Sequence, residues 1–169
     1  VLYLTDGGIM TYPDLDGKRN ILENAIDVLK ALNYKEIKVA CLAAKEKLNP
    51  KMPPTVDADA LKKMCEAGEF ADGVVVEGPI SFDLAVSKEA AEINKYDSPV
   101  AGDTDILLVP NIETGNGIGK TMTYFGNALS AGIIVGASAP VILVSRADSY
   151  ESKYYSILLG ALVAQNSSK

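Results

Sequence analysis

Residues 17–42 read GKRNILENAIDVLKALNYKEIKVACL and carry the two patterns that decide the fold. In residues 17–32 the apolar side chains recur at spacings near 3.6, which predicts an amphipathic helix with Asp14 or Asp16 as its N-terminal cap. Residues 37–42 form a nearly continuous apolar run, typical of a strand that is covered on both faces. A helix beside a buried strand is the building unit of a layered α/β domain.

The same alternation extends along the rest of the chain. Further apolar runs predict strands at residues 1–5, 74–76, 106–109, 133–135 and 141–144. Further helices are expected at residues 57–67, 82–93, 120–129 and 149–164. Because strands and helices alternate, we predict an α/β fold with a mainly parallel sheet.

The composition excludes several kinds of active site. The 169 residues include no histidine, which removes Ser-His-Asp triads, Cys-His dyads and histidine-bound metals. The net charge of −6 argues against a dedicated binder of nucleic acid or anionic membranes. Cys41 and Cys65 form no CxxC motif and are interpreted as buried or incidental thiols in a reducing compartment. No apolar stretch is long enough to span a bilayer, so we expect a cytoplasmic protein.

The first candidate site is the glycine-rich stretch PNIETGNGIGKT at residues 110–121. Its three glycines would let the backbone approach a ligand closely. Amides at a helix start would favour an anion, and Lys120 adds a positive charge. The spacing fits neither a P-loop nor the GxGxxG dinucleotide motif. An anion site and a simple glycine-rich turn between a strand and a helix are therefore equally open.

The second candidate site is VSRADSYESK at residues 144–153, where an apolar strand runs into a Ser-Arg pair. Ligands bind at the carboxyl ends of strands in open α/β sheets. Ser145 could donate a hydrogen bond there, and Arg146 could clamp a phosphate or stabilise a developing oxyanion. Asp148 and Glu151 are candidate bases, although their spacing is also that of a capping box at a helix start.

Two further stretches are weaker candidates. DSPVAGD at residues 97–103 precedes a strand. Pro99 and Gly102 mark a turn from which Ser98 could face a cleft, and a plain loop is the alternative. Glu77 follows a strand, where it could face a ligand or form a helix-start pair with Asp83.

The fifth stretch, Asp6-Gly7-Gly8, follows the first strand and could be a backbone turn or a ligand contact. Four of the five stretches follow a strand. Loops that follow parallel strands gather at one edge of a sheet, so their placement predicts a single ligand cleft.

Together these stretches resemble one enzyme family. The runs EGPISFDLAV, SPVAGDTDILLVPNIETGN and PVILVSRADSYESKYYSILLGALVA are similar to motifs of the phosphate acetyl/butyryltransferase family. The SRADS-x-ESKYYSI ending and the LTDGGIMTYPDL opening resemble the butyryltransferase branch, whereas the acetyltransferase branch usually has SRG after the strand. The resemblance extends over essentially all 169 residues.

This resemblance implies a domain arrangement. Family members are about twice as long and have two three-layer α/β/α domains, similar to the isocitrate/isopropylmalate dehydrogenase-like superfold. Residues 1–140 would form the second, inserted domain, and residues 141–169 would return toward an N-terminal domain absent from this sequence. The abrupt start VLYL fits such a fragment. The inserted domain usually carries the homodimer contact, so a homodimer is expected.

The resemblance also implies a reaction, in which an acyl group moves between coenzyme A and inorganic phosphate. For the butyryl branch, butyryl-CoA and phosphate give butyryl phosphate and CoA by direct attack, without a metal, an acyl-enzyme or a tightly bound cofactor. Because phosphate is the nucleophile, the enzyme has to position two anions and stabilise developing charge. Histidine is dispensable for such work.

Carried over position by position, the family's Ser-Arg pair falls on Ser145 and Arg146. The base of the acetyltransferases follows that serine by seven positions, where this chain has Ser152. Asp148 and Glu151 are therefore the candidate bases, with Asp148 nearer the strand end. The expected substrate-binding residues are Asn111, Gly115, Asn116, Lys120, Ser98 and Gly102.

Other functions stay open at this point. A phosphate acetyltransferase is the nearest alternative. A decarboxylating dehydrogenase on a similar superfold would need a metal-binding aspartate cluster, which the sequence does not show. A non-catalytic dimerisation or CoA-sensing domain is the third. Because further phosphate-binding arginines of the family lie in the absent half, the chain alone is expected to be inactive.

Overall fold

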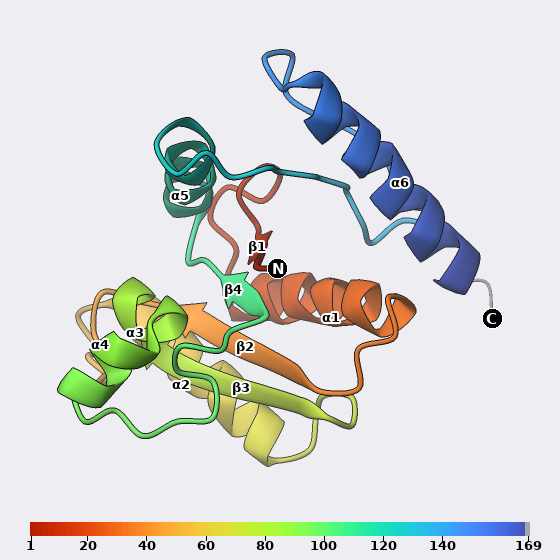
Figure 1. The fold of residues 1–169 in the computed structure, drawn as a ribbon. Coiled ribbons are helices and arrows are strands. Elements are labelled where there is room, and N and C mark those ends of the chain that lie inside the picture. The colour runs from red at the N-terminus through yellow and green to blue at the C-terminus, as the bar shows by residue number, and fades with distance from the viewer. Residues whose placement is uncertain (168–169) are drawn as a thin grey trace.

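The computed structural model describes residues 1–167, in which four parallel strands lie between layers of helices (Figure 1). The strands follow the order β1-β4-β2-β3 and comprise β1 (Tyr3–Thr5), β2 (Ile37–Leu42), β3 (Val74–Ile80) and β4 (Ile106–Leu108). The helices are α1 (Leu15–Ala31), α2 (Pro53–Glu66), α3 (Phe82–Val86), α4 (Lys88–Ile93), α5 (Ile112–Tyr124) and α6 (Tyr150–Ser167). The predicted α/β fold with a parallel sheet is confirmed.

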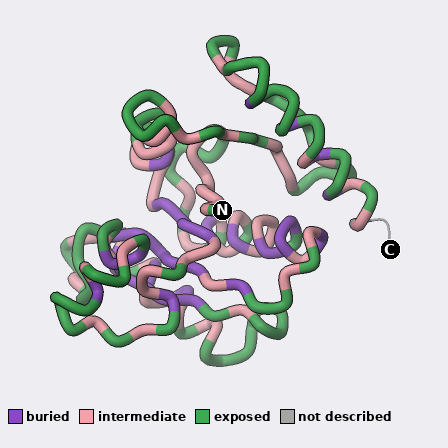
Figure 2. The backbone as a smooth tube through the Cα atoms, viewed as in Figure 1, coloured by how far each residue is buried: buried purple, intermediate pink, exposed green. Residues whose placement is uncertain are grey.

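Two apolar clusters, one on each face of the sheet, make up the core. On β2, Ile37 and Val39 pack with α1 and α2, whereas Ala40 and Leu42 pack with α3 and α4. All four side chains are buried, which explains why the strand reads as a continuous apolar run rather than an alternating one. Figure 2 shows the central strands largely buried and much of α6 exposed. The arrangement is that of a three-layer α/β/α domain.

Helix α1 forms where the sequence predicts it, for a local reason at each end. Asp14 caps it, since its carboxylate accepts a hydrogen bond from the Gly17 backbone N at 2.8 Å. The helix ends at Ala31, and Asn33 just beyond it has a φ of 68°, in the left-handed region that does not continue a helix. Between these ends Leu22 and Leu29 are fully buried and anchor the helix to the sheet.

Both cysteines agree with the interpretation as buried or incidental thiols, and neither forms a disulfide. Cys41 lies buried in β2, and burial raises the pKa of its thiol to about 12. Cys65 is half-buried in α2, where its Sγ donates to the Val74 carbonyl at 3.4 Å.

The single helix predicted at residues 82–93 is wrong, because the structure has two short helices there. Ser87 separates them with an extended backbone, φ −126° and ψ 115°. Its side chain then caps α4 by accepting a hydrogen bond from the Ala90 N at 3.1 Å. A serine that can bond the backbone competes with helix continuation, which is the physical reason for the break.

The two strands predicted at residues 133–135 and 141–144 are also wrong. The described chain has one antiparallel bridge in this region, between Ile134 and Val141. A β-forming run becomes a strand only where a neighbour satisfies its backbone groups, and this segment does not join the sheet.

Helix α6 forms close to its predicted bounds but is poorly covered. In Figure 1 it stands apart from the sheet, beyond the extended segment that follows α5. Its C-terminal part is attached to α1, with Val163 buried and the Asn166 amide donating to the Ala31 carbonyl at 2.7 Å. No helix within residues 1–167 combines the length and apolar character needed to cross a membrane.

Candidate functional site

The loop after β1 is folded by a single carboxylate. Asp6 accepts hydrogen bonds from three backbone amides, those of Gly8 at 2.8 Å, Ile9 at 3.0 Å and Met10 at 2.9 Å. The structure therefore shows Asp6-Gly7-Gly8 as a backbone turn, and the ligand contact that was its alternative stays a prediction. Since β1 and β4 are adjacent in the sheet, this turn lies where α5 begins.

The same loop, residues 6–12, is joined to α5 by three hydrogen bonds. The Asn116 Nδ2 donates to the Gly7 carbonyl at 3.4 Å, and the Ile112 N donates to the Thr11 carbonyl at 3.0 Å. The Tyr12 hydroxyl donates to the Glu113 carboxylate. The loop after β1 and the first half of α5 therefore form one unit at the carboxyl ends of β1 and β4, the edge where open α/β sheets bind ligands.

The glycine-rich stretch is helical, so the predicted turn between a strand and a helix is wrong, whereas the predicted anion site stays a prediction. Asn111 is the N-cap of α5, and its Oδ1 accepts hydrogen bonds from the Thr114 N at 3.0 Å and the Thr114 Oγ1 at 2.8 Å. The predicted helix at residues 120–129 accordingly begins at Ile112 and ends at Tyr124.

The glycines of α5 permit close packing against the sheet edge. A Cβ added to Gly115 would lie 2.6 Å from the Gly7 Cα, and one added to Gly119 would lie 3.4 Å from the Leu4 Cδ2. Gly117, on another side of the helix, would meet nothing within 4 Å. Two other predicted substrate-binding residues, Asn116 and Lys120, are exposed one helical turn apart.

A second polar group lies on β3. Glu77 is 8% exposed, and its carboxylate accepts hydrogen bonds from the Lys62 Nζ at 2.7 Å and the Gly78 N at 3.0 Å. The side chains of Ser98 and Tyr96 also lie close enough to this carboxylate to interact with it. Burial alone would raise the pKa of Glu77, but the interactions with Lys62 and Ser98 outweigh it and hold that pKa below its usual value.

These contacts correct the predicted helix-start pair of Glu77 with Asp83. Glu77 belongs to strand β3, whereas Asp83 lies in the first turn of α3. A hydrogen bond from Ser81 lowers the pKa of Asp83. The sequence could not predict that Lys62 pairs with Glu77. The two residues are fifteen positions apart, and only the packing of α2 on β3 brings them together.

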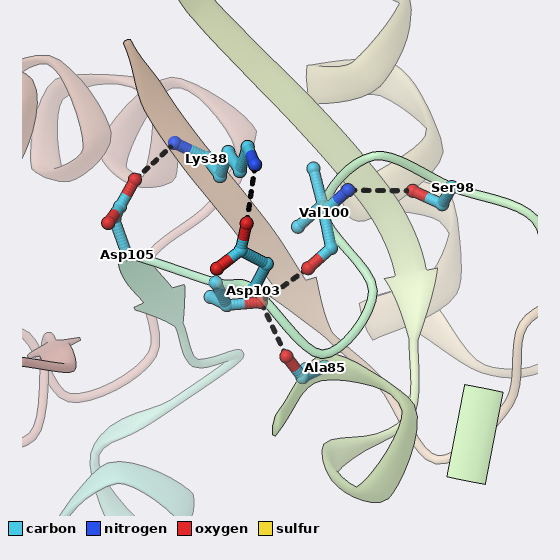
Figure 3. A network of polar contacts seen from close by, with 7 residues as sticks. Lys38, Ala85, Ser98, Val100, Asp103 and Asp105 are labelled. Carbon is cyan, nitrogen blue, oxygen red and sulfur yellow. Dashed lines mark hydrogen bonds and ion pairs between the residues drawn. The ribbon is translucent and has the colours of Figure 1, made fainter. Parts of the chain in front are cut away.

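The DSPVAGD stretch is a loop held by hydrogen bonds to its neighbours (Figure 3). Lys38 on β2 donates from its Nζ to Asp103 in this stretch at 2.6 Å, and from its backbone N to Asp105, two residues beyond the stretch, at 2.9 Å. The Ser98 Oγ accepts from the Val100 N at 3.2 Å. Gly102 has a φ of +68°, which makes it a turn residue in this structure.

A surface pocket of about 430 Å³ opens beside Ser98. Its lining combines the Ser98 and Tyr96 hydroxyls with Lys88, Lys95, Glu92 and Asp97. Among the predicted substrate-binding residues, Ser98 is the one that lines this pocket, and it also lies beside the Glu77 carboxylate.

The Ser-Arg stretch forms a turn before α6. The Asp148 Oδ2 accepts a hydrogen bond from the Ser145 N at 2.8 Å, and the Asp148 N donates to the Ser145 carbonyl at 3.1 Å. The predicted capping box of Asp148 with Glu151 is wrong, because the Ser149 Oγ accepts the hydrogen bond from the Ser152 N at 3.1 Å. Ser149 is thus the residue whose side chain bonds the first turn of α6.

Arg146 is exposed, and among residues 1–167 no ion pair engages its guanidinium. Glu151 is likewise exposed in the first turn of α6.

The structure divides the predicted cleft into three groups. It joins the Asp6-Gly7-Gly8 turn to the start of α5, and it joins Glu77 to Ser98. Within the described residues no hydrogen bond or ion pair connects either group to Ser145 or Arg146. The Ser-Arg turn lies away from the sheet because the strand that was to carry it does not form.

Two further features were not anticipated from the sequence. Lys18 is 7% exposed and forms an ion pair with Asp57 at 2.5 Å, next to the ends of β2 and β4. A larger apolar cavity of about 660 Å³ lies between β1, α1, α5 and α6. In the described part of the chain no three His, Cys, Asp or Glu side chains are grouped closely enough to hold a metal ion.

Comparison with known proteins decides the family. The model of the family described as Phosphate acetyl/butaryl transferase matches residues 1–161. The chain belongs to this family. The resemblance inferred from the EGP, SPVAGD and SRADS stretches is confirmed.

Relatives carry names from both branches of the family. A phosphate butyryltransferase of Clostridium acetobutylicum is 49% identical over 98% of this chain and 55% of its own length. A phosphate acetyltransferase of Rhizobium meliloti is 45% identical over 96% of this chain and 51% of its own length. The chain therefore spans about half the length of these relatives.

The fold is also that of a solved family structure. A crystal structure of a branched-chain phosphotransacylase from Enterococcus faecalis V583 superposes with a TM-score of 0.86 at 40% identity. That alignment covers 95% of this chain and 57% of the other protein.

Proposed function

We propose that this chain is part of a cytoplasmic phosphate acyltransferase that moves an acyl group between coenzyme A and inorganic phosphate. The observation that carries the proposal is the 49% identity to a phosphate butyryltransferase over 98% of the chain. We assign the butyryl branch rather than the acetyl branch because of the SRADS-x-ESKYYSI ending and the LTDGGIMTYPDL opening.

The proposal includes the domain arrangement. Residues 1–140 form the inserted domain of an isocitrate/isopropylmalate dehydrogenase-like superfold, and residues 141–169 return to a domain that the present chain lacks. Residues 168 and 169 lie outside the described part. Support comes from the exposed apolar side chains of the returning segment, which include Val141, Ile142, Leu143, Tyr154, Ile157 and Leu158. A helix that is apolar on several sides is normally buried on several sides.

In the proposed reaction an oxygen of inorganic phosphate attacks the thioester carbonyl carbon. The new C–O bond forms, the C–S bond breaks, and the electron pair leaves on the CoA sulfur, which then takes up a proton. Arg146 binds the phosphate or the developing charge, and the Ser145 hydroxyl donates to the carbonyl oxygen or the thiolate. The Arg146 guanidinium is exposed and forms no ion pair within residues 1–167, which supports this role.

Asp148 and Glu151 are the residues proposed to move the proton. The Asp148 carboxylate accepts the Ser145 N, so it lies next to the Ser-Arg pair. Glu151 is exposed on the first turn of the following helix. Asn111, Gly115, Asn116 and Lys120 on α5, with Ser98 and Gly102, complete the proposed substrate cleft, in which acyl-CoA and phosphate are the partners and a homodimer is the assembly.

The test is an assay of thiol release from acetyl-CoA, butyryl-CoA and isobutyryl-CoA with phosphate, using the complete chain at the length of its relatives. Butyryl-CoA should be turned over with the highest kcat/KM. A preference for acetyl-CoA would assign the acetyl branch. Loss of activity on chelation would overturn direct attack without a metal, and absence of turnover with every substrate would favour a non-catalytic dimerisation or CoA-sensing domain.

The 169-residue chain is a useful second sample. It should show no turnover, because half of the proposed cleft is missing. Calorimetric titration with CoA and with phosphate would measure the binding that this half retains, and turnover by the short chain would contradict the domain proposal.

A further inference from the structure

Gly7 and Gly115 form a backbone contact that leaves no room for a side chain on either residue. A Cβ added to Gly7 would lie 2.9 Å from the Gly115 carbonyl carbon and 3.2 Å from the Asn116 N. A Cβ added to Gly115 would lie 2.6 Å from the Gly7 Cα and 2.8 Å from a methyl carbon of Val109. Either methyl group would therefore force the loop and the helix apart by several tenths of an ångström.

Neither glycine is there for its conformational freedom. Both have φ values outside the left-handed region, so an alanine would suit the backbone of each. A glycine in the interior of a helix such as α5 costs about 1 kcal/mol relative to alanine. The close approach of the two backbones is what offsets this cost at Gly115.

The contact sets the position of residues that face the proposed cleft. Asn116 follows Gly115 directly and donates its amide to the Gly7 carbonyl. Lys120 lies one helical turn beyond Asn116 and is exposed like it. Asp6 in turn holds the Gly7 loop through its three amide bonds. A displacement of Gly7 would therefore also displace the Asn116 and Lys120 side chains on α5.

We infer that Gly7 and Gly115 are positioning residues, which hold Asn116 and Lys120 in register with the acyl-CoA or phosphate of the proposed reaction. The inference rests on the proposed acyltransferase function and names the part of the fold that aligns its α5 side chains. A misplacement of roughly 1 Å in such an aligning element can lower the rate about 100-fold.

The test compares Gly7→Ala with Gly8→Ala in the complete chain. Gly8 is the matched control, because a Cβ there would meet nothing within 4 Å and its amide bond to Asp6 is kept. Assays well below the melting temperature of every variant should show kcat/KM reduced roughly 10- to 100-fold for Gly7→Ala, with a raised KM for one substrate. Gly8→Ala should keep the wild-type kcat and KM.

A double-mutant cycle separates positioning from loss of stability. If Gly7 acts through Asn116, the loss of kcat/KM in the double variant Gly7→Ala, Asn116→Ala should be much smaller than the product of the two single losses. The reason is that either change alone already removes the interaction that the other would remove. Additive effects would overturn the inference, as would equal kinetics of Gly7→Ala and Gly8→Ala. An inactive wild-type chain would overturn the proposed function itself, so the two failures are distinguishable.

Should Gly7→Ala fail to fold, Tyr12→Phe tests the same unit without adding an atom. It removes the hydroxyl that bonds Glu113 and loosens the loop from α5. The KM that Gly7→Ala is expected to raise should rise by a smaller factor in Tyr12→Phe. Unchanged kinetics of a folded Tyr12→Phe protein would overturn the inference.

Discussion

The Nζ atom of Lys62 on α2 lies 2.7 Å from the Oε1 atom of Glu77 on β3. Glu77 is a charged residue in the buried half of that strand, with a side chain only 10% exposed. The Lys62 side chain is 36% exposed, and its Nζ end contacts the Glu77 carboxylate. A buried carboxylate is tolerated here because a charge and several hydrogen bonds compensate its desolvation.

Replacing Glu77 by glutamine should remove an acid-sensitive part of the stability. The pKa of Glu77 is lowered in the folded protein, so its contribution is present above the unfolded pKa of roughly 4.3 and is lost as the pH falls through the folded value. Urea unfolding from about pH 7 to about pH 3 should show Glu77→Gln less stable than wild type near neutrality and equal to it in acid. A difference that stays constant with pH would contradict this prediction.

Replacing Asp57 by alanine should leave the buried Lys18 ammonium without its partner. The Lys18 side chain is only 9% exposed, and removing one partner of a buried pair costs roughly 3 kcal/mol. Asp59→Ala on the same helix is the matched control. Asp59 is about as exposed as Asp57, 25% against 22%, but its partner Lys63 is 69% exposed.

Chemical denaturation of these two variants measures the difference in the free energy of unfolding. The exposed pair should be worth only about 0.3–0.5 kcal/mol. Equal losses in the two variants would show that the burial of Lys18 is irrelevant to the stability.

Replacing Gly102 by alanine should destabilise the fold in addition to any effect on a substrate. Its φ of +68° is unfavourable for alanine, and the new Cβ would lie 2.4 Å from the Lys88 N. Gly68→Ala is the control, since Gly68 has a φ of +77° with nothing within 4 Å of an added Cβ.

Backbone strain of about 1–2 kcal/mol is common to both variants, and the overlap at Gly102 should add roughly 1–3 kcal/mol. Thermal or urea unfolding checks the order. If the Gly102→Ala and Gly68→Ala proteins were equally stable, the loop at residues 97–103 would accommodate the added Cβ without a loss of stability.

Replacing Arg146 by alanine in the complete enzyme should lower kcat by roughly 10²–10³, as removal of one transition-state donor can. Lys153→Ala removes a nearby exposed positive charge and serves as the control, with kcat expected near that of wild type. A negligible change in Arg146→Ala would remove this residue from the mechanism.

Asp148→Asn and Glu151→Gln should decide the base. Asparagine keeps an acceptor for the Ser145 N, so the turn survives while the proton acceptor is lost. The base is the residue whose variant loses the acidic limb of the pH profile of kcat, because protonation of the base at low pH is what stops the wild-type reaction. If both variants retain wild-type profiles, neither carboxylate moves the proton.

Several features of this protein follow from its sequence because their causes are local or periodic. The apolar run at β2 predicts a strand covered on both faces, and the structure buries it between two apolar clusters. Asp14 and Asp16 before an amphipathic segment predict a capped start of α1, and Asp14 provides that cap, since a capping bond spans only three residues. The long collinear motifs likewise pointed to the family that the comparison shows.

Other features were decided by contacts between residues far apart in the chain. Glycines that favour a loop became part of helix α5, because Gly115 packs on Gly7, more than a hundred residues earlier. The apolar residues 141–144 did not become a strand, since no strand of the sheet pairs with them. Local propensity could not anticipate either outcome, because the free energy of a close backbone contact or of a strand pairing belongs to both partners and exists only once the fold brings them together.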